Sequence, residues 1–334
     1  MKRKVLITGA AGFIGSKLAE HLTELGFEVV GCDIYNFRNQ FFDVGDSHHL
    51  ALQRLRFDRI AHFLKRNDIE YHSIDISDHS QVSKLFQKIQ PDVVVHLAAQ
   101  AGVRHSVKAP MDFVKSNLNG FANVIDACKT NGIQHFLYAS SSSVYGVRSE
   151  APFRETDRCD VPESFYAATK IANEQMAKAY FAQYRTASLG LRFFTVYGPW
   201  GRMDMAPYLF AQKMRSKHAI QLFGEGVLKR DFTFIGDTVY AIARLIQNGI
   251  SHTHADVVNI GHSNPVQVND FVQTLSECLN VKPTIELLPM QVSDVPLTCA
   301  SDDKLRNMIG EWPHTSLRDG LSEMVQWLEK WNPV

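Results

Sequence analysis

An apolar run at residues 5–8 leads directly into the segment TGAAGFIG at residues 8–15, and a stretch with helical apolar spacing follows. Glycines at this spacing suit a strand, a tight turn and a helix, because they permit the turn, a close approach of the backbone to a ligand, and close packing of helix on strand. The helix start offers free N–H groups and a partial positive charge, which favour phosphate. The segment predicts a phosphate-binding turn; a purely structural turn is the alternative.

The alternation of short apolar runs with helical stretches continues along the chain, and it is typical of a parallel sheet with helices on both faces. The run at residues 92–97 is nearly all apolar and β-branched, as expected of a central strand buried on both sides. The expected strands are residues 5–8, 28–33, 70–74, 92–97, 135–140 and 188–193, and the expected helices are residues 14–25, 81–89, 111–129 and 163–184. The predicted fold class is α/β, a Rossmann-type doubly wound parallel sheet with a smaller C-terminal α/β substrate-binding domain.

Polar or small residues follow three of the expected strands. Asp33 closes the second strand 18 residues after Gly15, where a carboxylate would accept hydrogen bonds from the adenosine ribose of NAD and repel the 2′-phosphate of NADP. A turn residue at a strand end is the alternative for Asp33. Asp75 and Ile76 follow the third strand and suit either an adenine contact or plain turn chemistry. Leu97-Ala98-Ala99 ends the fourth strand, where small residues allow a flat ring to approach or merely pack.

Beyond about residue 193, glycines and prolines break the chain into short elements, which indicates a second domain. We expect an NAD-binding domain at residues 1–192 plus about 231–258, and a second domain at residues 193–230 plus about 259–334. The connection at residues 37–68 is too long for an ordinary loop. Its stretch at residues 50–64 has helical spacing, so we expect it to cover the cofactor site or to form a partner surface.

The composition excludes several classes of protein. Of 334 residues, 45% are hydrophobic, and 35 Lys+Arg balance 35 Asp+Glu, so nothing favours disorder, nucleic acid or anionic lipid. No apolar run is long enough to span a membrane, and glycines interrupt the N-terminal run, which argues against a signal peptide. Five scattered cysteines and fourteen histidines form no metal-ligand pattern. We expect a cytoplasmic protein without a metal.

Tyr166 and Lys170 fall in an expected helix, and their separation of four residues places both side chains on one face. A phenol with a pKa near ~10 is a poor base at neutral pH, but an adjacent ammonium and a nicotinamide cation both favour the phenolate. Tyr166 can then take a hydroxyl proton while hydride leaves the same carbon. A tyrosine and a lysine at this spacing also occur by chance.

Ser140-Ser141-Ser142-Ser143 lies at the C-terminal end of a central strand, where open α/β sheets bind their ligands. If extended geometry persists, Ser141 and Ser143 share one face and Ser142 points to the other. A hydroxyl there can shuttle a proton or hold a substrate oxygen. The alternative is a polar entry into a loop.

Seven motifs, TGAAGFIG, HLAAQAGVRHS, YASSSSVYG, YAATK, LRFFTVYGPWGRMDM, KRDFTFIGD and QVSDVP, together resemble the extended short-chain dehydrogenase/reductase family. Within it, the chain is similar to nucleotide-sugar 4-epimerases that act on UDP-glucuronate. The resemblance runs from residue 4 to about residue 331 and implies tightly bound NAD+. The catalytic set that it implies is Ser141, Tyr166 and Lys170. The implied cofactor set is Gly9, Gly12, Phe13, Ile14, Gly15, Asp33, Asp75, Ile76, Leu97, Ala98, Ala99, Asn117, Ser140, Tyr166 and Lys170.

The same resemblance implies a substrate set in the second domain. Thr195 stands where UDP-galactose relatives have asparagine, and with Ser142 and Ser143 it would hold the sugar carboxylate. The other implied substrate contacts are Arg230 and Arg202 to the diphosphate, Phe223 to the uracil and Asp294 to the uridine ribose. Two residues depart from the family pattern: Ile34 replaces a common asparagine, and Met203 replaces a common proline.

Related enzymes differ at the two residues before VYG. The 4,6-dehydratases carry Asp-Glu there and the decarboxylases Ser-Glu, whereas this chain has Ser142-Ser143. Without a carboxylic acid at this point we expect hydride to leave, the ring of the 4-keto intermediate to flip, and hydride to return, so that NAD+ is regenerated. The alternatives are a 4-epimerase of UDP-glucose or UDP-N-acetylglucosamine, or a non-catalytic NAD-binding sensor, which would commonly lack the tyrosine and the lysine.

The helices expected at residues 111–129 and 163–184 carry more apolar residues than one sheet-facing stripe needs: Phe113, Ile125, Met176, Ala177, Tyr180 and Phe181. Dimers of the family pair these helices in a four-helix bundle, so we expect a homodimer. Burial under the second domain is the alternative.

Overall fold

The structure is a computed structural model that describes residues 2–34, 55, 58–148, 150–251, 253–290 and 295–331. The chain divides into two compact units. Unit 1 comprises Met1–Gly146, Arg158–Arg192 and Val239–Val258, and unit 2 comprises Val147–Asp157, Phe193–Thr238 and Asn259–Val334.

Two segments that we expected in the first domain, residues 147–157 and 231–238, cluster with unit 2. The first does so because Phe153 is bonded on both sides within unit 2: its N–H donates to Cys299 O at 2.7 Å, and its carbonyl accepts from Ser301 N at 2.8 Å. The second belongs there because β9, Lys229–Phe234, pairs with two other strands of unit 2.

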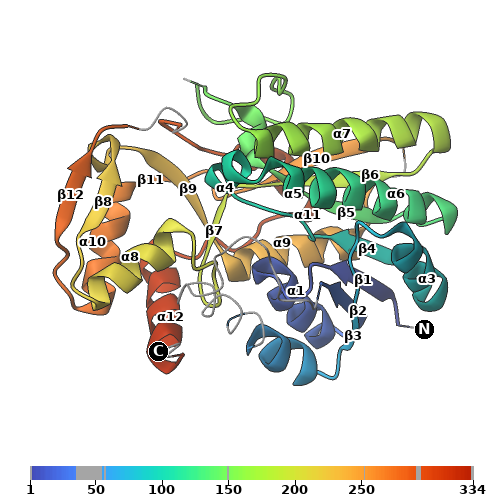
Figure 1. Ribbon diagram of the computed structural model, residues 1–334, viewed down its shortest axis with the longest axis horizontal. Helices are drawn as coiled ribbons and strands as arrows, with labels where there is room; N and C mark the ends of the chain where they lie inside the picture. Colours follow the sequence, from blue (N-terminus) through green and yellow to red (C-terminus); the bar gives the residue numbers. More distant parts are fainter. Residues whose placement is uncertain are drawn as a thin grey trace. The chain divides into compact units, whose positions relative to one another are not determined.

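Unit 1 is built on a seven-stranded sheet, counted over the described residues, in the order β10-β6-β5-β4-β1-β2-β3 (Figure 1). The strands of this sheet are β1 Lys4–Thr8, β2 Glu28–Asp33, β3 Glu70–Ser73, β4 Val93–His96, β5 Phe136–Ser141, β6 Ser188–Phe193 and β10 Ala255–Ile260. The last residue of β6 and the last two residues of β10 belong to unit 2. β1 pairs in parallel with both β2 and β4, so the strand order changes direction at β1. β4 is buried along its whole length, as its apolar sequence predicts. The predicted Rossmann-type fold class is confirmed.

Helices cover both faces of this sheet (Figure 1). α3 (His79–Ile89), α6 (Gly120–Thr130) and α7 (Phe165–Tyr184) pack together on one face, with α1 (Phe13–Glu24) and α9 (Ile235–Asn248) on the other. The helix expected at residues 111–129 is a succession of α5 (Pro110–Phe113), a π-helical segment η2 (Val114–Asn119) and α6. α7 begins after Ser164, whose side chain accepts the N–H of Ala167 and so satisfies a free donor of the first turn.

Unit 2 contains two small sheets. β9 lies between β7 (Thr195–Tyr197) and β11 (Pro265–Gln267), and β8 (Ile220–Phe223) pairs in parallel with β12 (Ile285–Leu288). The rings of Phe232 and Phe271 stack in its core with centroids 4.4 Å apart. Its helices are α8 (Ala206–Arg215), α10 (Val268–Leu279), α11 (Asp303–Ile309) and α12 (Leu317–Lys330).

The long connection expected between β2 and β3 is described only at Leu55 and from residue 58 onward. There a π-helical segment η1, Ile60–Lys65, packs against α1 and buries Phe63 and Leu64. The beginning of the helix expected at residues 50–64 lies outside the described residues.

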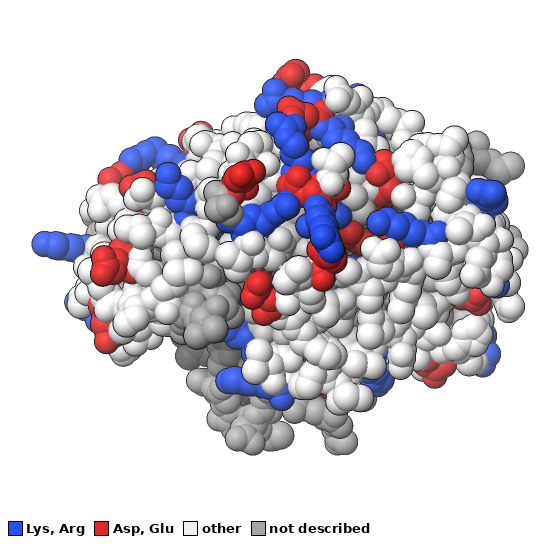
Figure 2. Space-filling view, turned by 90° about the horizontal axis from the view of Figure 1, so that it is seen from above, with Lys and Arg blue, Asp and Glu red and all other residues white. Residues whose placement is uncertain are grey.

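The surface mixes charges of both signs. On the face drawn in Figure 2, Lys and Arg side chains lie beside Asp and Glu side chains, and uncharged side chains cover much of the rest. This distribution agrees with the equal numbers of acidic and basic residues. Among the described residues, no helix combines the length and the apolar character that crossing a membrane requires.

Candidate active site

The glycine turn brings the end of β1 against the end of β4. Gly9 has a φ of +75°, and a Cβ placed on it would lie 2.6 Å from the backbone nitrogen of Ala98. A Cβ on Gly15 would overlap the carbonyl oxygen of Gly9, so only glycine allows α1 to start this close to the turn. Gly12 occupies the N-cap position of α1 without a side-chain acceptor. The helix start therefore fits a diphosphate, with Phe13 and Ile14 in its first turn.

Asp33 ties the end of β2 to the same turn. Its Oδ2 accepts the N–H of Ala11 at 3.0 Å, and its Oδ1 accepts the N–H of Ile34 at 2.8 Å. Arg59, only 6% exposed, places its Nη1 3.5 Å from the carbonyl oxygen of Ala11. Sequence reasoning missed this arginine, because it lies in a long connection without a motif. A carboxylate and a guanidinium beside a glycine turn suit the ribose and phosphate groups of a dinucleotide.

Asp75 and Ile76 take the turn role that we left open. Oδ1 of Asp75 accepts from the N–H and the hydroxyl of Ser77, at 2.9 and 2.7 Å, and Oδ2 lies 2.9 Å from Lys115 Nζ. Burial alone would raise the pKa of Asp75, but these bonds outweigh it and lower the pKa. Ile76 is buried in the core of unit 1, in contact with the start of α6. A contact of either residue with adenine stays a prediction.

The hydroxyl of Thr8, at the end of β1, holds the end of β4. Ala98 N–H donates to Thr8 Oγ1 at 3.2 Å, and that oxygen lies 2.7 Å from Nδ1 of His96. Burial, with a smaller effect of the Lys170 charge, lowers the pKa of His96 to about 3, so this imidazole is neutral at physiological pH. Leu97, Ala98 and Ala99 are half-buried, which leaves part of their surface open to a ligand.

Asn117 connects the loop after β4 to α7. Its side chain accepts from Gln100 N at 2.8 Å and donates to Gln100 O at 3.0 Å and to Thr169 Oγ1 at 3.1 Å. Asn117 is only 1% exposed. It fixes the backbone beside the expected cofactor site, and a direct contact with the cofactor stays a prediction.

Tyr166 and Lys170 share one face of α7, as their spacing predicts. The Nζ of Lys170 lies 6.0 Å from the ring centre of Tyr166 and donates to the carbonyl oxygen of Ala139 at 2.7 Å. Lys170 is 3% exposed, and burial lowers its pKa to about 8, against the opposing effect of the Glu174 carboxylate. The Phe113 ring packs edge-on against Tyr166 at 6.1 Å. The result is a half-buried phenol with an ammonium beside it.

The extended geometry considered for the four serines does not persist beyond Ser141. β5 ends at Ser141, and a 3-10 turn, Ser142–Tyr145, follows. The Ser141 hydroxyl accepts from the N–H of Ser143 at 3.2 Å and from its hydroxyl at 2.9 Å. Ser141 and Ser143 therefore meet because the chain turns and not because a strand alternates.

Glu174 and Arg192 are buried partners in unit 1 that sequence reasoning missed. Nε and Nη2 of Arg192 donate to the two carboxylate oxygens of Glu174 at 2.9 and 2.8 Å. The hydroxyl of Ser140, a predicted cofactor residue, also donates to Glu174 at 2.6 Å. No motif marked the glutamate, and the arginine stood out only as part of LRFFTVYG.

The predicted substrate residues of unit 2 lie on its strands and loops. Thr195 begins β7 and Phe223 ends β8; both are half-buried. Arg230 lies on β9 and is half-buried, with Nη1 donating to Lys229 O at 2.9 Å. Asp294 lies outside the described residues.

Arg202 lines a small pocket within unit 2. Its Nε and Nη2 donate to the two carboxylate oxygens of Asp204 at 3.0 and 2.6 Å. Aromatic and apolar side chains form much of the wall, including Tyr197, Tyr208 and Trp327. Met203, one of the departures from the family pattern, is buried.

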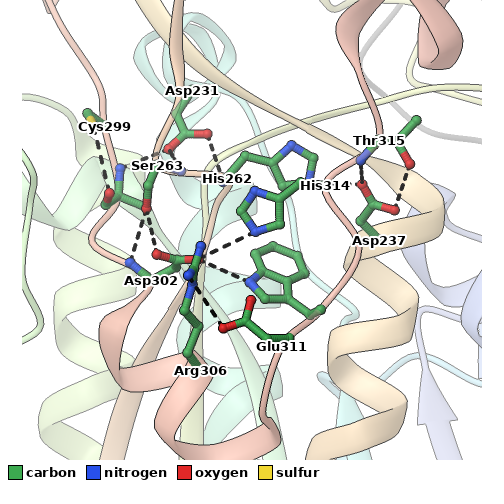
Figure 3. Close-up of polar contacts among 12 residues, drawn as sticks. Asp231, Asp237, His262, Ser263, Cys299, Asp302, Arg306, Glu311, His314 and Thr315 are labelled. Carbon is green, nitrogen blue, oxygen red and sulfur yellow. Dashed lines mark hydrogen bonds and ion pairs between the residues drawn. The ribbon is translucent and has the colours of Figure 1, made fainter.

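Unit 2 also contains a group of titratable residues, which we call the carboxylate cluster: the buried Asp231, Asp237, His262 and Asp302, and the more exposed His314 (Figure 3). Asp231 accepts the backbone N–H groups of His262, Ser263 and Ala300 at 2.9, 3.0 and 2.9 Å. The two histidine rings stack 4.7 Å apart, and His262 Nε2 lies 2.9 Å from Asp237.

Comparisons with known proteins agree with this geometry. The model of the NAD-dependent epimerase/dehydratase family matches residues 5–261. Protein CapI of Staphylococcus aureus is 39% identical over 97% of this chain and 98% of its own length. A probable UDP-glucuronate 4-epimerase of Rhizobium meliloti is 36% identical over 98% and 97% of the two chains. The crystal structure of the UDP-glucuronic acid 4-epimerase of Bacillus cereus with UDP-glucuronic acid and NAD has a TM-score of 0.85 at 30% identity, over 98% and 99%.

Proposed function

The chain belongs to the NAD-dependent epimerase/dehydratase family, and on this premise we propose that it converts UDP-glucuronate into UDP-galacturonate. It is an NAD-dependent nucleotide-sugar 4-epimerase, so the resemblance seen in the sequence is confirmed. The observation that carries the proposal is the Tyr166–Lys170 pair on α7 of unit 1, combined with hydroxyls and no carboxylic acid at residues 142 and 143.

The residues of the turn fit the cofactor. The donors at the start of α1, between Gly9 and Gly15, would hold the diphosphate, and Asp33 would accept from the adenosine ribose. Bound NAD supplies an acceptor and later a donor of hydride. Tight retention of NAD+ through the cycle is part of the proposal.

The chain's own residues handle the proton. Tyr166 takes the proton of the sugar 4-hydroxyl, because the Lys170 ammonium stabilises its phenolate. The Ser141 hydroxyl bonds the same sugar oxygen while a 4-keto intermediate exists. The backbone N–H of Ser143 donates to the Ser141 hydroxyl oxygen, so this hydroxyl is oriented before the substrate binds, and the Ser143 hydroxyl can turn from Ser141 toward the substrate.

The substrate carboxylate requires further hydroxyls. A 4-keto uronate is a β-keto acid and loses carbon dioxide when the breaking bond aligns with the carbonyl π system. We propose that Thr195, Ser142 and Ser143 hold the carboxylate near the plane of the ketone, where this overlap is poor. Arg230 and Arg202 would bind the diphosphate, Phe223 the uracil and Asp294 the uridine ribose; these roles stay predictions.

The deciding experiment incubates the purified protein with UDP-glucuronate, adds no NAD, and follows the sugar protons by NMR. We expect UDP-galacturonate to appear, which supports both the substrate and the retained cofactor. Turnover of UDP-glucose or UDP-N-acetylglucosamine, without turnover of UDP-glucuronate, would reject this substrate and favour the alternative 4-epimerases.

A second experiment tests the carboxylate proposal. Thr195→Ala should raise the ratio of UDP-pentose by-product to epimer, because one donor to the carboxylate is lost. Thr195→Ser keeps the hydroxyl and serves as the matched control. An unchanged product ratio in the alanine variant contradicts the proposed role of Thr195.

We also propose a homodimer formed through α5, α6 and α7. Three of the residues expected at its interface, Phe113, Ile125 and Ala177, are instead buried in the core of the chain itself. On the surface, Met111 is 70% and Phe165 is 40% exposed, and these apolar side chains support the proposal. Light scattering on the purified protein measures the mass.

All five cysteines are free thiols, which supports a reducing, cytoplasmic location.

A further inference from the structure

Glu174 and Arg192 form an ion pair inside unit 1 that the proposed reaction does not use. Both side chains are almost fully buried, at 3% and 4% exposure. The guanidinium binds both oxygens of the carboxylate, and its carbon lies 4.8 Å from the ring centre of Tyr145. A buried ion pair contributes little net stability compared with apolar residues of the same size, because desolvation offsets the attraction. Because net stability does not explain why the pair is buried here, its position in the fold is the place to look for its role.

The pair connects α7, β5 and β6 next to the residues that carry the proposed reaction. Glu174 lies one helical turn after Lys170 on α7, Ser140 lies on β5, and Arg192 lies on β6. Two successive residues of β5 are bonded from α7: Ala139 O accepts from Lys170 Nζ at 2.7 Å, and Ser140 Oγ donates to Glu174 at 2.6 Å. These bonds fix how far α7 stands along β5. They thereby fix Tyr166 and Lys170 relative to Ser141, the next residue of β5.

The charge of Glu174 also acts on Lys170. Glu174 is the carboxylate whose field favours the ammonium form of Lys170, against burial. Two buried titratable groups on the neighbouring strands carry no charge: His96 on β4, whose pKa burial lowers to about 3, and Tyr138 on β5, whose pKa burial raises well above its usual range. The elements packed against α7 further carry Tyr145, Asp112 on α5, Lys115 on η2, Asp126, Cys128 and Lys129 on α6, and Arg104, His105 and Lys108 on α4 (Val103–Lys108), while Tyr166 lies on α7 and Arg192 on β6.

We propose that Glu174 and Arg192 are positioning residues for the epimerase reaction, which set the place of Tyr166 and Lys170 against Ser141 and balance the charge beside Lys170. The proposal rests on the proposed function, because it assigns Tyr166 and Lys170 their proton-transfer roles. Neither residue touches the substrate.

The first test is Glu174→Gln, which keeps hydrogen-bonding atoms and removes the charge. Arg192 then adds an unbalanced positive charge, so Lys170 loses its proton at a lower pH. Because the reaction needs the ammonium, we expect kcat to fall about tenfold, the alkaline limb of the kcat profile to move about one pH unit lower, and KM to change little. A merely structural role would lower stability and leave this limb in place.

Two further variants separate charge from geometry. The double variant Glu174→Gln with Arg192→Gln is neutral again, so its alkaline limb should return toward that of the wild type. Arg192→Lys keeps the charge balance and loses the two-point attachment, so it should lower kcat without moving the limb. Glu277→Gln is the matched control, because it breaks a Glu–Arg pair with Arg318 on the surface of unit 2; its profile should not change.

A readout independent of turnover keeps this proposal distinct from the proposed function. In protein labelled with 13C at lysine Cε, the Lys170 signal, assigned with Lys170→Arg, should titrate near a pKa of about 8 and shift lower in Glu174→Gln. If no UDP-sugar is epimerised, the proposed function fails while this titration still tests the charge balance. An unchanged Lys170 titration and an unchanged alkaline limb in Glu174→Gln would overturn the positioning proposal.

Discussion

The Glu174–Arg192 pair of unit 1 and Asp231 in the carboxylate cluster of unit 2 bury negative charge in two different ways. Glu174 is compensated by a cation, since Arg192 binds both of its oxygens. Asp231 is 0% exposed, and instead it accepts three backbone N–H groups. Burial raises the pKa of Asp231, although those backbone bonds and the nearby His262 oppose the rise.

The difference shows what each arrangement is suited to do. A side-chain cation fixes two elements to one another and carries a full charge that neighbouring groups sense. Backbone N–H groups bring together loops near residues 262 and 300 without adding a net charge. We therefore expect changes in the Glu174–Arg192 pair to alter both stability and catalysis, and changes at Asp231 to alter stability alone.

The largest expected effect comes from removing the cation of unit 1. Arg192→Met leaves Glu174 buried without its partner, so we expect the free energy of unfolding to fall by about 3–5 kcal/mol. Urea denaturation followed by circular dichroism measures this change. In the double variant Glu174→Met with Arg192→Met no charge is stranded, and most of the stability should return. If the double variant is as unstable as the single one, packing and not charge explains the loss.

A smaller effect is expected in unit 2. Asp231→Asn replaces one carboxylate oxygen by an NH2 group, which faces backbone donors, so at least one N–H loses its acceptor. We expect a loss of about 1–3 kcal/mol in the free energy of unfolding. The kcat profile with pH should keep its alkaline limb, in contrast to Glu174→Gln. A shift of that limb in Asp231→Asn would contradict the separation between the two regions.

The same contrast explains which residues the sequence could predict. Tyr166 and Lys170 were predictable because a four-residue spacing on a helix brings two side chains together whatever the tertiary structure. Glu174 and Arg192 belong to different elements, and only the packing of α7 on the sheet joins them. Asp231 has backbone partners, and a backbone N–H carries no residue identity that a motif could record.

Local backbone geometry also limited what the sequence could predict. The parallel sheet followed from apolar runs that are buried on both faces, as in β4. The meeting of Ser141 with Ser143 depends on a 3-10 turn, which a run of four serines does not distinguish from a strand. Asp75 satisfied two patterns equally well, and only its bonds to Ser77 and its ion pair with Lys115 identified the turn.

The smallest expected effect distinguishes two aspartates within the carboxylate cluster by their pH dependence. Burial alone would raise the pKa of Asp302, but bonds from Arg306, Trp312 and Ser263 outweigh it and lower the pKa. Its stabilising contribution is therefore present above the unfolded-state pKa, near ~3.9, and is lost as pH falls through the lower folded-state pKa. For Asp231 the raised folded-state pKa gives the opposite sign, because stability falls as pH rises from ~3.9 through that pKa.

Urea unfolding of the wild type, Asp302→Asn and Asp231→Asn between pH 3 and 7 measures both signs. The stability advantage of the wild type over Asp302→Asn should shrink toward acid pH, whereas its advantage over Asp231→Asn should grow. Since both variants lose one carboxylate from the same cluster, each serves as the control for the other. Parallel slopes would mean that Asp302 and Asp231 do not differ in the way that their hydrogen-bond partners predict.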